Sequence, residues 1–554
     1  MSDDGSDSSI PLVSKHARRK NMNTTCNGEQ QLPSGALASS SVRVDRILDW
    51  VFWVLSLVAV TLIMTLNRRQ WFFADDFVFA FDRQLSDPVG LLRPHFGHNT
   101  VLPAIVFQLI YQVVGLHQFW PYQIAVALSH VAVACLQRAL MLRMGTGRLL
   151  ATAGATLFLF FGSGRENLTW AFQITLNGSL AFAFWALLVA DRDRELDSIS
   201  RRCDLLASLL LSGAALCSNL GPFLACVVGL AVFLRRGLSA SIRVITPPLA
   251  LFLTWRLWAP KGQEAVKAAD IGQAVVWGRE HLFVSFHSLT HVLVVSILLM
   301  MAVFGAIVMT VKNGRRPEDN IPLALLVGLV LLAASLGYTR GGFIFPASTP
   351  RYVYLGASLA LPLSAWALGR LAESSKNLMA LAVALLLVGL PANMRLIGPS
   401  TLYDELALGS PVMTAAVASV AVDEAVAGPY VIDGLFTANG LIRASKEGRI
   451  PVLAFSSEAR REALLRVALG RAVRAPVNCR PMASAGMVSL RRGDYLDLGP
   501  VPVRLALADY PDGPFVQEYF PEDGGLRGLI VLVDRIDIIV EPYGDATSIH
   551  KCRG

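Results

Sequence analysis

Apolar segments of spanning or near-spanning length recur through most of this chain. After the first, from Ile47 to Leu66, they lie at about 120–143, 149–162, 169–190, 204–219, 222–234, 242–258, 290–311, 321–338, 352–368 and 377–392. A helix of about 20 apolar residues spans the roughly 30 Å hydrocarbon core of a membrane. The sequence therefore predicts an α-helical polytopic membrane protein with about eleven transmembrane helices.

Composition and charge support a membrane protein and exclude other classes. Of the 554 residues, 54% are hydrophobic and 16% are charged, which is far from the balance of a soluble domain. The formal net charge is +8, but the basic residues stand at the ends of apolar segments rather than in one stripe, so nucleic acid is not an expected partner. The cysteines lack C-x-x-C spacing, which argues against a zinc or redox motif.

The N-terminal 47 residues are rich in Ser, Asp, Asn and basic residues, and we expect a disordered cytoplasmic tail. The apolar segment that follows is too long for a signal-peptide core and lacks a small-residue cleavage site, so it should remain as a membrane anchor. The segment from Val101 to Leu116 is also apolar. Counting it as a span would move Arg138, Arg143 and Arg148 to the outside, so we predict an amphipathic helix at the membrane surface.

The basic residues predict the orientation. With eleven spans they fall on one side, the cytoplasm, in these groups: Lys15–Lys20 with Arg43 and Arg46, Arg138–Arg148, Arg192–Arg202, Arg235–Arg243, Lys312–Arg316, and Arg370 with Lys376. The outer side receives loops 67–119, 163–168, 259–289 and 339–351 and everything after about 393. We therefore expect a multi-pass cell-membrane protein with a cytoplasmic N-terminus and an extracytoplasmic C-terminal domain.

Composition changes again at about residue 393. Residues 393–554 have ordinary charge density and frequent Gly and Pro, which predicts a small α/β or mostly β domain. A helical pattern runs from Ser457 to Arg474, and β-rich patterns begin at Met487. Cys479 and Cys552 are the only cysteines of this domain, and an oxidising outer compartment would allow them to pair.

Two adjacent carboxylates, Asp75 and Asp76, follow Trp71-Phe72-Phe73-Ala74 just after the first span. Carboxylates at a membrane boundary cost desolvation energy unless they have partners or a function. The alternative is a solvated helix end that Arg68 and Arg69 balance.

This organisation resembles the glycosyltransferase C superfamily: a first helix, an acidic pair directly after it, a long first outer loop with a surface helix, many spans and an outer C-terminal domain. The segment His95-Phe96-Gly97-His98-Asn99-Thr100-Val101-Leu102-Pro103 resembles the polar cluster that precedes the surface helix in that family. The resemblance implies that residues 48–392 form a glycosyltransferase-like transmembrane domain whose first outer loop is 67–119. It implies a polyprenyl-phosphate sugar donor, an envelope glycan, lipid or protein acceptor, and contact with membrane lipid.

The resemblance also assigns roles to the acidic residues. An inverting transfer needs a base that takes the proton of the acceptor hydroxyl, and Asp75 is the expected base. Asp76 would then orient the acceptor or hold a divalent cation, which only some members of the superfamily use, so the cofactor and any metal ligands stay open. In the turn Gly162–Asn167, Arg165 and Glu166 are expected to bind substrate, with Glu166 a contact for the acceptor. The alternative is an ion pair between these two residues at a helix end.

Two arginines of the last outer loop are expected to bind the phosphate of the donor. Arg340 and Arg351 carry guanidinium groups suited to phosphate oxygens, and Tyr352 follows Arg351. The alternative is that Arg351 and Tyr352 only mark the start of a helix at the interface. His95 and His98 are further candidates for phosphate or sugar contact. Without a third ligand nearby they do not predict zinc, and each could also be a structural histidine.

Two other functions remain open at this stage. A polytopic transporter or lipid-linked-glycan flippase would need charges in the middle of spans and broken helices in an internal repeat. The strongest polar groups instead cluster at outer helix ends. A non-catalytic scaffold for envelope assembly would leave Asp75 and Asp76 replaceable.

Overall fold

A computed structural model describes residues 34–191, 197–259, 269–342, 345–398, 410–426, 431–432, 436–471, 479–481, 486–497, 503–509, 511, 515–518, 528–542 and 550–553. Residues 1–33 of the expected tail lie outside these ranges. The chain forms two compact units, residues 1–47 and residues 48–554.

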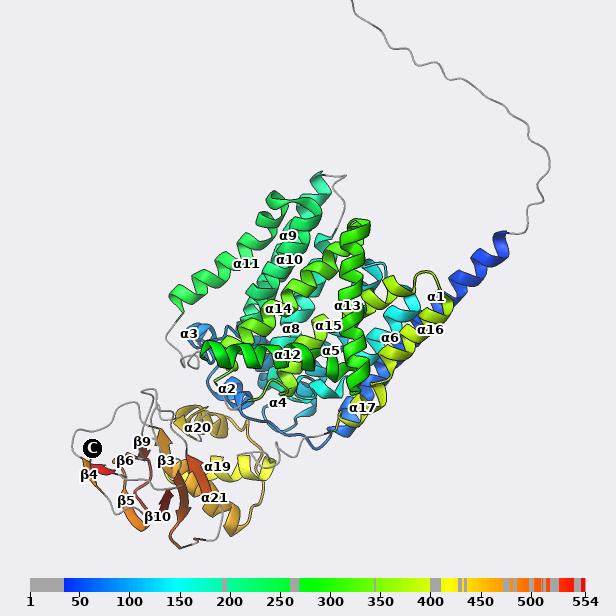
Figure 1. Ribbon diagram of the computed structural model, residues 1–554. Helices are drawn as coiled ribbons and strands as arrows, with labels where there is room; N and C mark the ends of the chain where they lie inside the picture. Colours follow the sequence, from blue (N-terminus) through cyan, green and yellow to red (C-terminus); the bar gives the residue numbers. More distant parts are fainter. Residues whose placement is uncertain are drawn as a thin grey trace, which may run out of the picture. The chain divides into compact units, whose positions relative to one another are not determined.

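Eight helical stretches of the described chain are long and apolar enough to cross a membrane. They are α1 (Ser34–Leu66), α5 (Trp120–Arg143), the 3-10 turn Ala171–Gln173 continued by α8 (Ile174–Ala190), α11 (Leu238–Trp258), α13 (Leu293–Asn313), α14 (Asn320–Arg340) with the 3-10 turn Pro317–Asp319 before it, α15 (Pro350–Ala372), and α16 (Lys376–Leu387) continued by α17 (Leu390–Arg395). Helix α1 begins before the expected tail boundary at residue 47. The chain is thus a mostly helical protein with several membrane-span-like helices (Figure 1).

The count of eleven spans is not confirmed, because three of the expected segments form helices that are too short or too polar. Helix α6 (Arg148–Leu159) has 12 residues and α10 (Leu220–Arg236) has 17. At 1.5 Å per residue these reach only about 18 and 26 Å. Helix α9 (Asp197–Cys217) is long enough but carries charged residues in its first turns.

Other helices lie in the loops that were expected outside. The first loop contains α2 (Asp75–Phe81), α3 (Pro88–Leu92) and α4 (Val101–Val114). Helix α4 occupies the segment predicted as a surface helix, and it buries Ala104, Phe107 and Tyr111 while leaving Val113 exposed. The segment 259–289, expected as a loop, contains the 20-residue helix α12 (Ile271–Thr290), which packs on α14 and α15. It is not among the span-like helices of the described chain, and it carries Arg279 and Glu280 in its interior.

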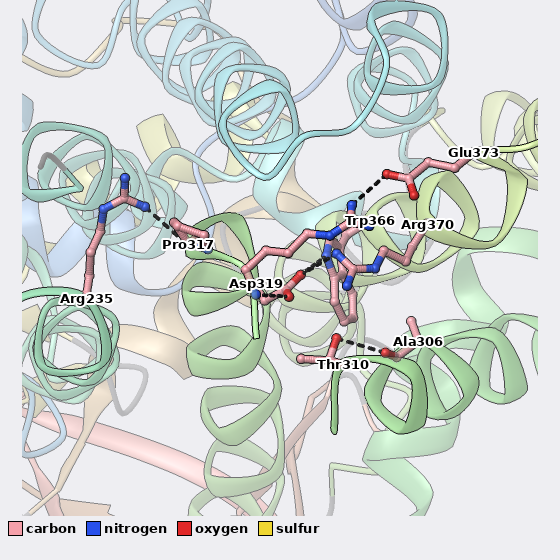
Figure 2. Close-up of polar contacts among 9 residues, drawn as sticks. Arg235, Ala306, Thr310, Pro317, Asp319, Trp366, Arg370 and Glu373 are labelled. Atoms are coloured by element: carbon pink, nitrogen blue, oxygen red, sulfur yellow. Dashed lines mark hydrogen bonds and ion pairs between the residues drawn. The ribbon is translucent and has the colours of Figure 1, made fainter. Parts of the chain in front are cut away.

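One end of the helix bundle is held by ion pairs between arginines and carboxylates. Asp319, which precedes α14 and is fully buried, accepts hydrogen bonds from Arg370 at the end of α15 (3.0 Å) and from Trp366 (3.3 Å) (Figure 2). The other clusters at this end are Asp49 with Arg138 and Arg148, Asp191 with Arg143 and Arg235, and Asp204 with Arg236 and Arg243.

These contacts bring together the loops that the arginine pattern assigned to one side. Arg143 and Arg235 share Asp191, Arg315 donates to the carbonyl of Leu234, and Arg316 pairs with Glu373. Segments 138–148, 235–243, 312–316 and 370–376 are therefore linked at one end of the bundle, as the positive-inside pattern requires of loops on the same side.

The C-terminal region combines helices with two antiparallel sheets. Its helices are α19 (Pro411–Asp423), α20 (Ala438–Lys446) and α21 (Ser457–Ala468). In the described residues one sheet has the order β2-β1-β3-β9-β6-β11-β4 and the other the order β5-β10-β7-β8. The strands are β1 (Val431–Ile432), β2 (Phe436–Thr437), β3 (Leu469–Arg471), β4 (Cys479–Pro481), β5 (Gly486–Arg491), β6 (Asp494–Asp497), β7 (Val503–Leu507), β8 (Phe515–Glu518), β9 (Gly528–Val531), β10 (Arg535–Pro542) and β11 (His550–Arg553). The expected β-rich pattern after Met487 is confirmed, whereas α21 ends before Arg474.

Two hydrophobic cores stabilise residues 48–554. The first lies among the bundle helices, with α15 at its centre, because every residue in the apolar window of α15 is buried. The second joins the first loop to the C-terminal region: Phe72, Phe77 and Phe81 belong to the same buried cluster as Phe436 and Leu441. The first loop and the C-terminal region are thus packed into one core.

Candidate functional site

Asp75, the expected base, starts α2 with one carboxylate oxygen held and the other free. Its Oδ1 lies 2.8 Å from His95 Nε2, and because a carboxylate only accepts hydrogen bonds, the histidine donates. Within the described ranges, Asp75 Oδ2 has no hydrogen-bond partner. The Asp75 side chain is 14% exposed, whereas that of His95 is 3% exposed. Of the two groups, Asp75 is therefore the one that an incoming molecule can reach.

The backbone is strained beside both members of this pair. Ala74 directly precedes Asp75 and has a φ of 44°, and Phe96 directly follows His95 and has a φ of 47°. Positive φ costs a non-glycine residue on the order of 1–3 kcal/mol, and such residues concentrate at functional sites. Phe96 and Gly97 form a tight turn in which His95 and His98 exchange backbone hydrogen bonds of 2.9 and 2.8 Å. The turn fixes both histidines relative to α2.

His98 joins this turn to Arg340 at the end of α14. Arg340 Nη2 lies 3.3 Å from His98 Nε2. Burial, together with the nearby Arg340 charge, lowers the pKa of His98 to about 4, so the ring is neutral at neutral pH and accepts from Arg340. No carboxylate pairs with Arg340 in the part of the chain that the structure describes. Arg340 therefore has a positive charge that no carboxylate of the described residues neutralises.

Asp76 has a different environment from Asp75. Its side chain is fully buried, Oδ2 accepts from the backbone N–H of Phe73 at 3.0 Å, and Oδ1 accepts from that of Phe172 at 2.8 Å. Burial and the neighbouring Asp75 raise the pKa of Asp76 well above its usual value, while the two N–H donors oppose the shift. Asp76 thus ties the start of α2 to the segment before α8.

Glu166 and Arg351 form the second polar part of the site. Arg351 Nη1 lies 2.9 Å from Glu166 Oε2, so the partner of Glu166 is Arg351 rather than its neighbour Arg165. Burial raises the pKa of Glu166 in spite of the nearby Arg351. The Arg351 guanidinium also contacts the rings of Phe345 and Tyr352, with its carbon 4.6 and 5.1 Å from their centroids. Arg351 and Tyr352 do start helix α15, but their side chains also belong to this cluster.

The segment 170–172 connects the two parts. Trp170 Nε1 donates to the carbonyl of Phe73 at 3.2 Å, and the Trp170 ring lies 5.9 Å from the Arg351 guanidinium carbon. Phe172 bonds Asp76 through its backbone and contacts the His95 ring, with centroids 5.3 Å apart. The structure thus brings Asp75, Asp76, His95, His98, Arg340, Glu166, Arg351 and Tyr352 into one chain of contacts. Arg165 is half-buried at the start of the short helix α7 (Glu166–Thr169), without an ion pair in the described ranges.

Several residues of the site were not predicted. Asn219, at the start of α10, accepts from the N–H of Asn99 (3.0 Å) and donates to the carbonyl of Gly97 (2.9 Å), so it holds the histidine turn. The sequence feature that could have pointed to Asn219 is the polar pair Ser218-Asn219 in the short connection between two apolar segments. Trp170 and Phe172 gave no signal, because aromatic residues are common at helix ends in membrane proteins.

The donor set does not fit a divalent cation. No group of three or more His, Cys, Asp or Glu side chains within the described residues could hold a metal ion. Both oxygens of Asp76 are bonded to backbone N–H groups, and Asp75 and His95 are bonded to each other. A hard cation with six or more oxygen ligands could use the unpartnered Asp75 Oδ2, but it would have to replace the other bonds to obtain further ligands from these side chains.

The fold and the site together define a polytopic helical protein with a buried acid–histidine–arginine cluster. This cluster lies at the bundle end opposite the arginine pairs, because Arg340 ends α14 and Arg351 begins α15, whereas Asp319 precedes α14 and Arg370 ends α15.

Neither a protein-family model nor a curated protein matches the sequence. Among solved structures, the chain is similar to the oligosaccharyltransferase of Archaeoglobus fulgidus. A crystal structure of that enzyme in a complex with Zn and sulfate aligns with a TM-score of 0.42 and 10% identity, over 73% of this chain and 58% of that chain. A second, tethered through a disulfide bond to an acceptor peptide containing the NVT sequon, aligns with a TM-score of 0.43 and 11% identity, over 74% and 60%. This chain spans less than two thirds of the length of either.

Proposed function

We propose that this protein is a membrane glycosyltransferase that moves a sugar from a polyprenyl-phosphate donor to a glycan, lipid or protein acceptor at the outer face of the membrane. One observation carries the proposal: the partly exposed Asp75 carboxylate is fixed through one oxygen by a buried histidine, while its other oxygen has no hydrogen-bond partner among the described residues. The same contact chain holds two arginines, Arg340 and Arg351.

In the proposed reaction, Asp75 Oδ2 takes the proton of the acceptor hydroxyl as the acceptor oxygen attacks the anomeric carbon of the sugar. The bond between that carbon and the phosphate oxygen breaks, and the bonding pair leaves with the polyprenyl phosphate. His95 holds the carboxylate in one orientation, and the greater exposure of Asp75 favours it over His95 as the base. Asp76 cannot act as a second nucleophile without losing both of its backbone hydrogen bonds, so we assign it to positioning.

Arg340 is the first choice for the donor phosphate. Its hydrogen-bond partner, His98, is neutral at neutral pH, so the Arg340 charge is available to a phosphate. Arg351 is already paired with Glu166, and a phosphate there would compete with that carboxylate. A role in binding the sugar or the acceptor therefore suits the cluster of Arg351, Glu166 and Tyr352 at least as well as a role in binding phosphate.

The linked arginine loops support the proposed orientation. If the end that carries the arginine pairs is cytoplasmic, the site at the other helix ends faces outward, where the donor sugar and the acceptor would meet.

The test is transfer of radiolabelled sugar by purified protein across a panel of polyprenyl-phosphate donors. Asp75→Asn should fold and bind donor but lose roughly 10²–10⁴-fold in turnover, as expected for loss of a general base. Arg340→Gln should raise the donor KM. Asp87→Asn is the matched control, because Asp87 caps α3 in the same loop and asparagine can also cap a helix.

Unchanged turnover in well-folded Asp75→Asn protein would refute the assignment of Asp75 as the base and favour a structural role for the acidic pair. Label in no acceptor, across the whole donor panel, would refute the glycosyltransferase and favour a transporter or flippase.

A further inference from the structure

The C-terminal region contacts α2, the helix that carries the proposed base, at the end opposite to Asp75. Asp82 directly follows α2, and its carboxylate accepts both the backbone N–H (3.1 Å) and the hydroxyl (2.5 Å) of Thr437. The Thr437 hydroxyl in turn accepts from the N–H of Gly440 at 3.1 Å and thereby caps α20. One hydrogen-bond chain thus joins the end of α2 to the start of α20.

A second bond and close packing reinforce this junction. Arg443 of α20 donates to the carbonyl of Phe81 at 2.5 Å, placing a cation at the negative end of α2. Phe436 packs against Phe77 and Phe81, with centroids 5.7 and 5.1 Å apart. A Cβ on Gly440 would lie 2.8 Å from Phe81 Cβ and from Phe81 O, so the two helices approach as closely as backbone allows.

Helix α2 depends on its neighbours for its position. It has seven residues, which is too short for a helix to be stable alone in water. At its start, Asp76 accepts a hydrogen bond from the backbone of Phe172. In its second half, Gln108 of α4 donates to the carbonyls of Phe79 and Ala80. At its end, Thr437 donates to Asp82 and Arg443 donates to the carbonyl of Phe81. Because α2 is a short helix, a shift of its C-terminal end should also change the position of Asp75 at its start.

We propose that the C-terminal region positions the catalytic base, with Thr437 and Arg443 holding α2 so that Asp75 meets the acceptor at the required distance. The inference rests on the proposed function. It makes Thr437 and Arg443 positioning residues, because neither touches the reacting groups. Residues more than 330 positions from α2 in the sequence would then help to set the geometry of the active site.

The test compares two helix-cap losses in the same region of the full-length protein. Thr437→Val removes the hydroxyl that bonds Asp82 and caps α20, while Ser456→Ala removes the cap of α21, which does not bond α2. We expect Thr437→Val to lower kcat by about tenfold or more with the donor KM unchanged, since a misplacement of about 1 Å can cost up to 10²-fold. Thr437→Ser should restore turnover to within about twofold, and Ser456→Ala should leave it near that of the wild type.

Hydrogen exchange of the α2 amides separates this inference from the proposed function. Faster exchange of these amides in Thr437→Val, but not in Ser456→Ala, supports the role of Thr437 in holding α2 even if the protein transfers no sugar, whereas the positioning of the base also requires the loss of kcat. If Thr437→Val does not fold, Arg443→Gln, which keeps the α20 cap, replaces it in both measurements. Wild-type turnover and wild-type α2 exchange in the folded variant would overturn the inference.

Discussion

Cys479 and Cys552 should form a disulfide bond, because the register of their strands places the two backbone positions opposite each other. Strands β4 and β11 are antiparallel neighbours in which these two residues lie directly opposite each other. Opposed residues in an antiparallel pair have Cα atoms about 4.5 or 5.5 Å apart, below the limit of about 7 Å for a disulfide. Pro481, two residues along the edge strand β4, lacks an N–H, which favours a non-hydrogen-bonded pair there. Because the two kinds of pair alternate, Cys479 and Cys552 would then also be in the closer, non-hydrogen-bonded kind.

The expected magnitude follows from the length of the closed loop. For a loop of about 70 residues, the chain-entropy model gives about 4 kcal/mol of stabilisation, roughly a thousandfold in the folding equilibrium, less any strain. The perturbation is Cys479→Ser, and Cys226→Ser is the control because Cys226 is exposed and free on α10. Unfolding of the C-terminal region by denaturant should show the loss in Cys479→Ser and in reduced wild type, but not in Cys226→Ser.

Thiol counting on denatured, unreduced protein is the decisive assay. Two of the seven cysteines should resist alkylation until a reductant is added. Alkylation of all seven without reduction would refute the bridge and would weaken the assignment of this region to an oxidising compartment.

Two further predictions concern stability. The pKa of His98 is about 4 in the folded protein and about 6.5 when unfolded, so its contribution to stability is present above pH 6.5 and is lost as the pH falls toward 4. This loss should reach roughly 3 kcal/mol at about pH 4 and roughly 2 kcal/mol at pH 5. Melting curves at pH 7.5 and pH 5 should show a smaller acid destabilisation in His98→Gln than in wild type; equal shifts in both proteins would contradict the assignment. Arg370→Met should destabilise the bundle by about 3–5 kcal/mol because it leaves Asp319 buried and unpaired. Adding Asp319→Asn should recover part of that loss, and no recovery in the double variant would argue against the pair.

Much of the helical framework was predictable, because hydropathy and arginine position are local signals. All eleven predicted apolar segments coincide with helices, but length and charge reduce the span-like helices of the described residues to eight. Helix α12 was missed because its buried face alternates with charged positions such as Arg279 and Glu280, so its mean hydropathy is ordinary. Sequence periodicity alone does not distinguish a helix buried on one side from a polar loop helix.

The structure brings most of the predicted site residues into one chain of contacts, but the sequence did not predict their environments or their partners. Asp75 and Asp76 are adjacent and chemically identical, and only the fold shows that one is partly exposed while the other is buried between two N–H donors. The pairing of Glu166 with Arg351 joins residues 185 positions apart, whereas the sequence suggested only the neighbour Arg165 as a possible ion-pair partner. The junction between Asp82 and Thr437 spans 355 positions, and no local pattern marks such a contact.

Because α15 is completely buried, the geometry of the site should depend little on the thickness of the surrounding bilayer. Every residue in the apolar window of α15 is covered by protein, whereas only 22% of the corresponding window is buried in α1 and in α16–α17. Lipid chains therefore act on α1 and α16, and any mismatch between hydrophobic length and membrane thickness is absorbed there by tilting. The packing of α15 against other helices sets the position of Arg351, at the start of α15, along the membrane normal. The cluster around Arg351 should consequently keep its geometry in membranes of different thickness.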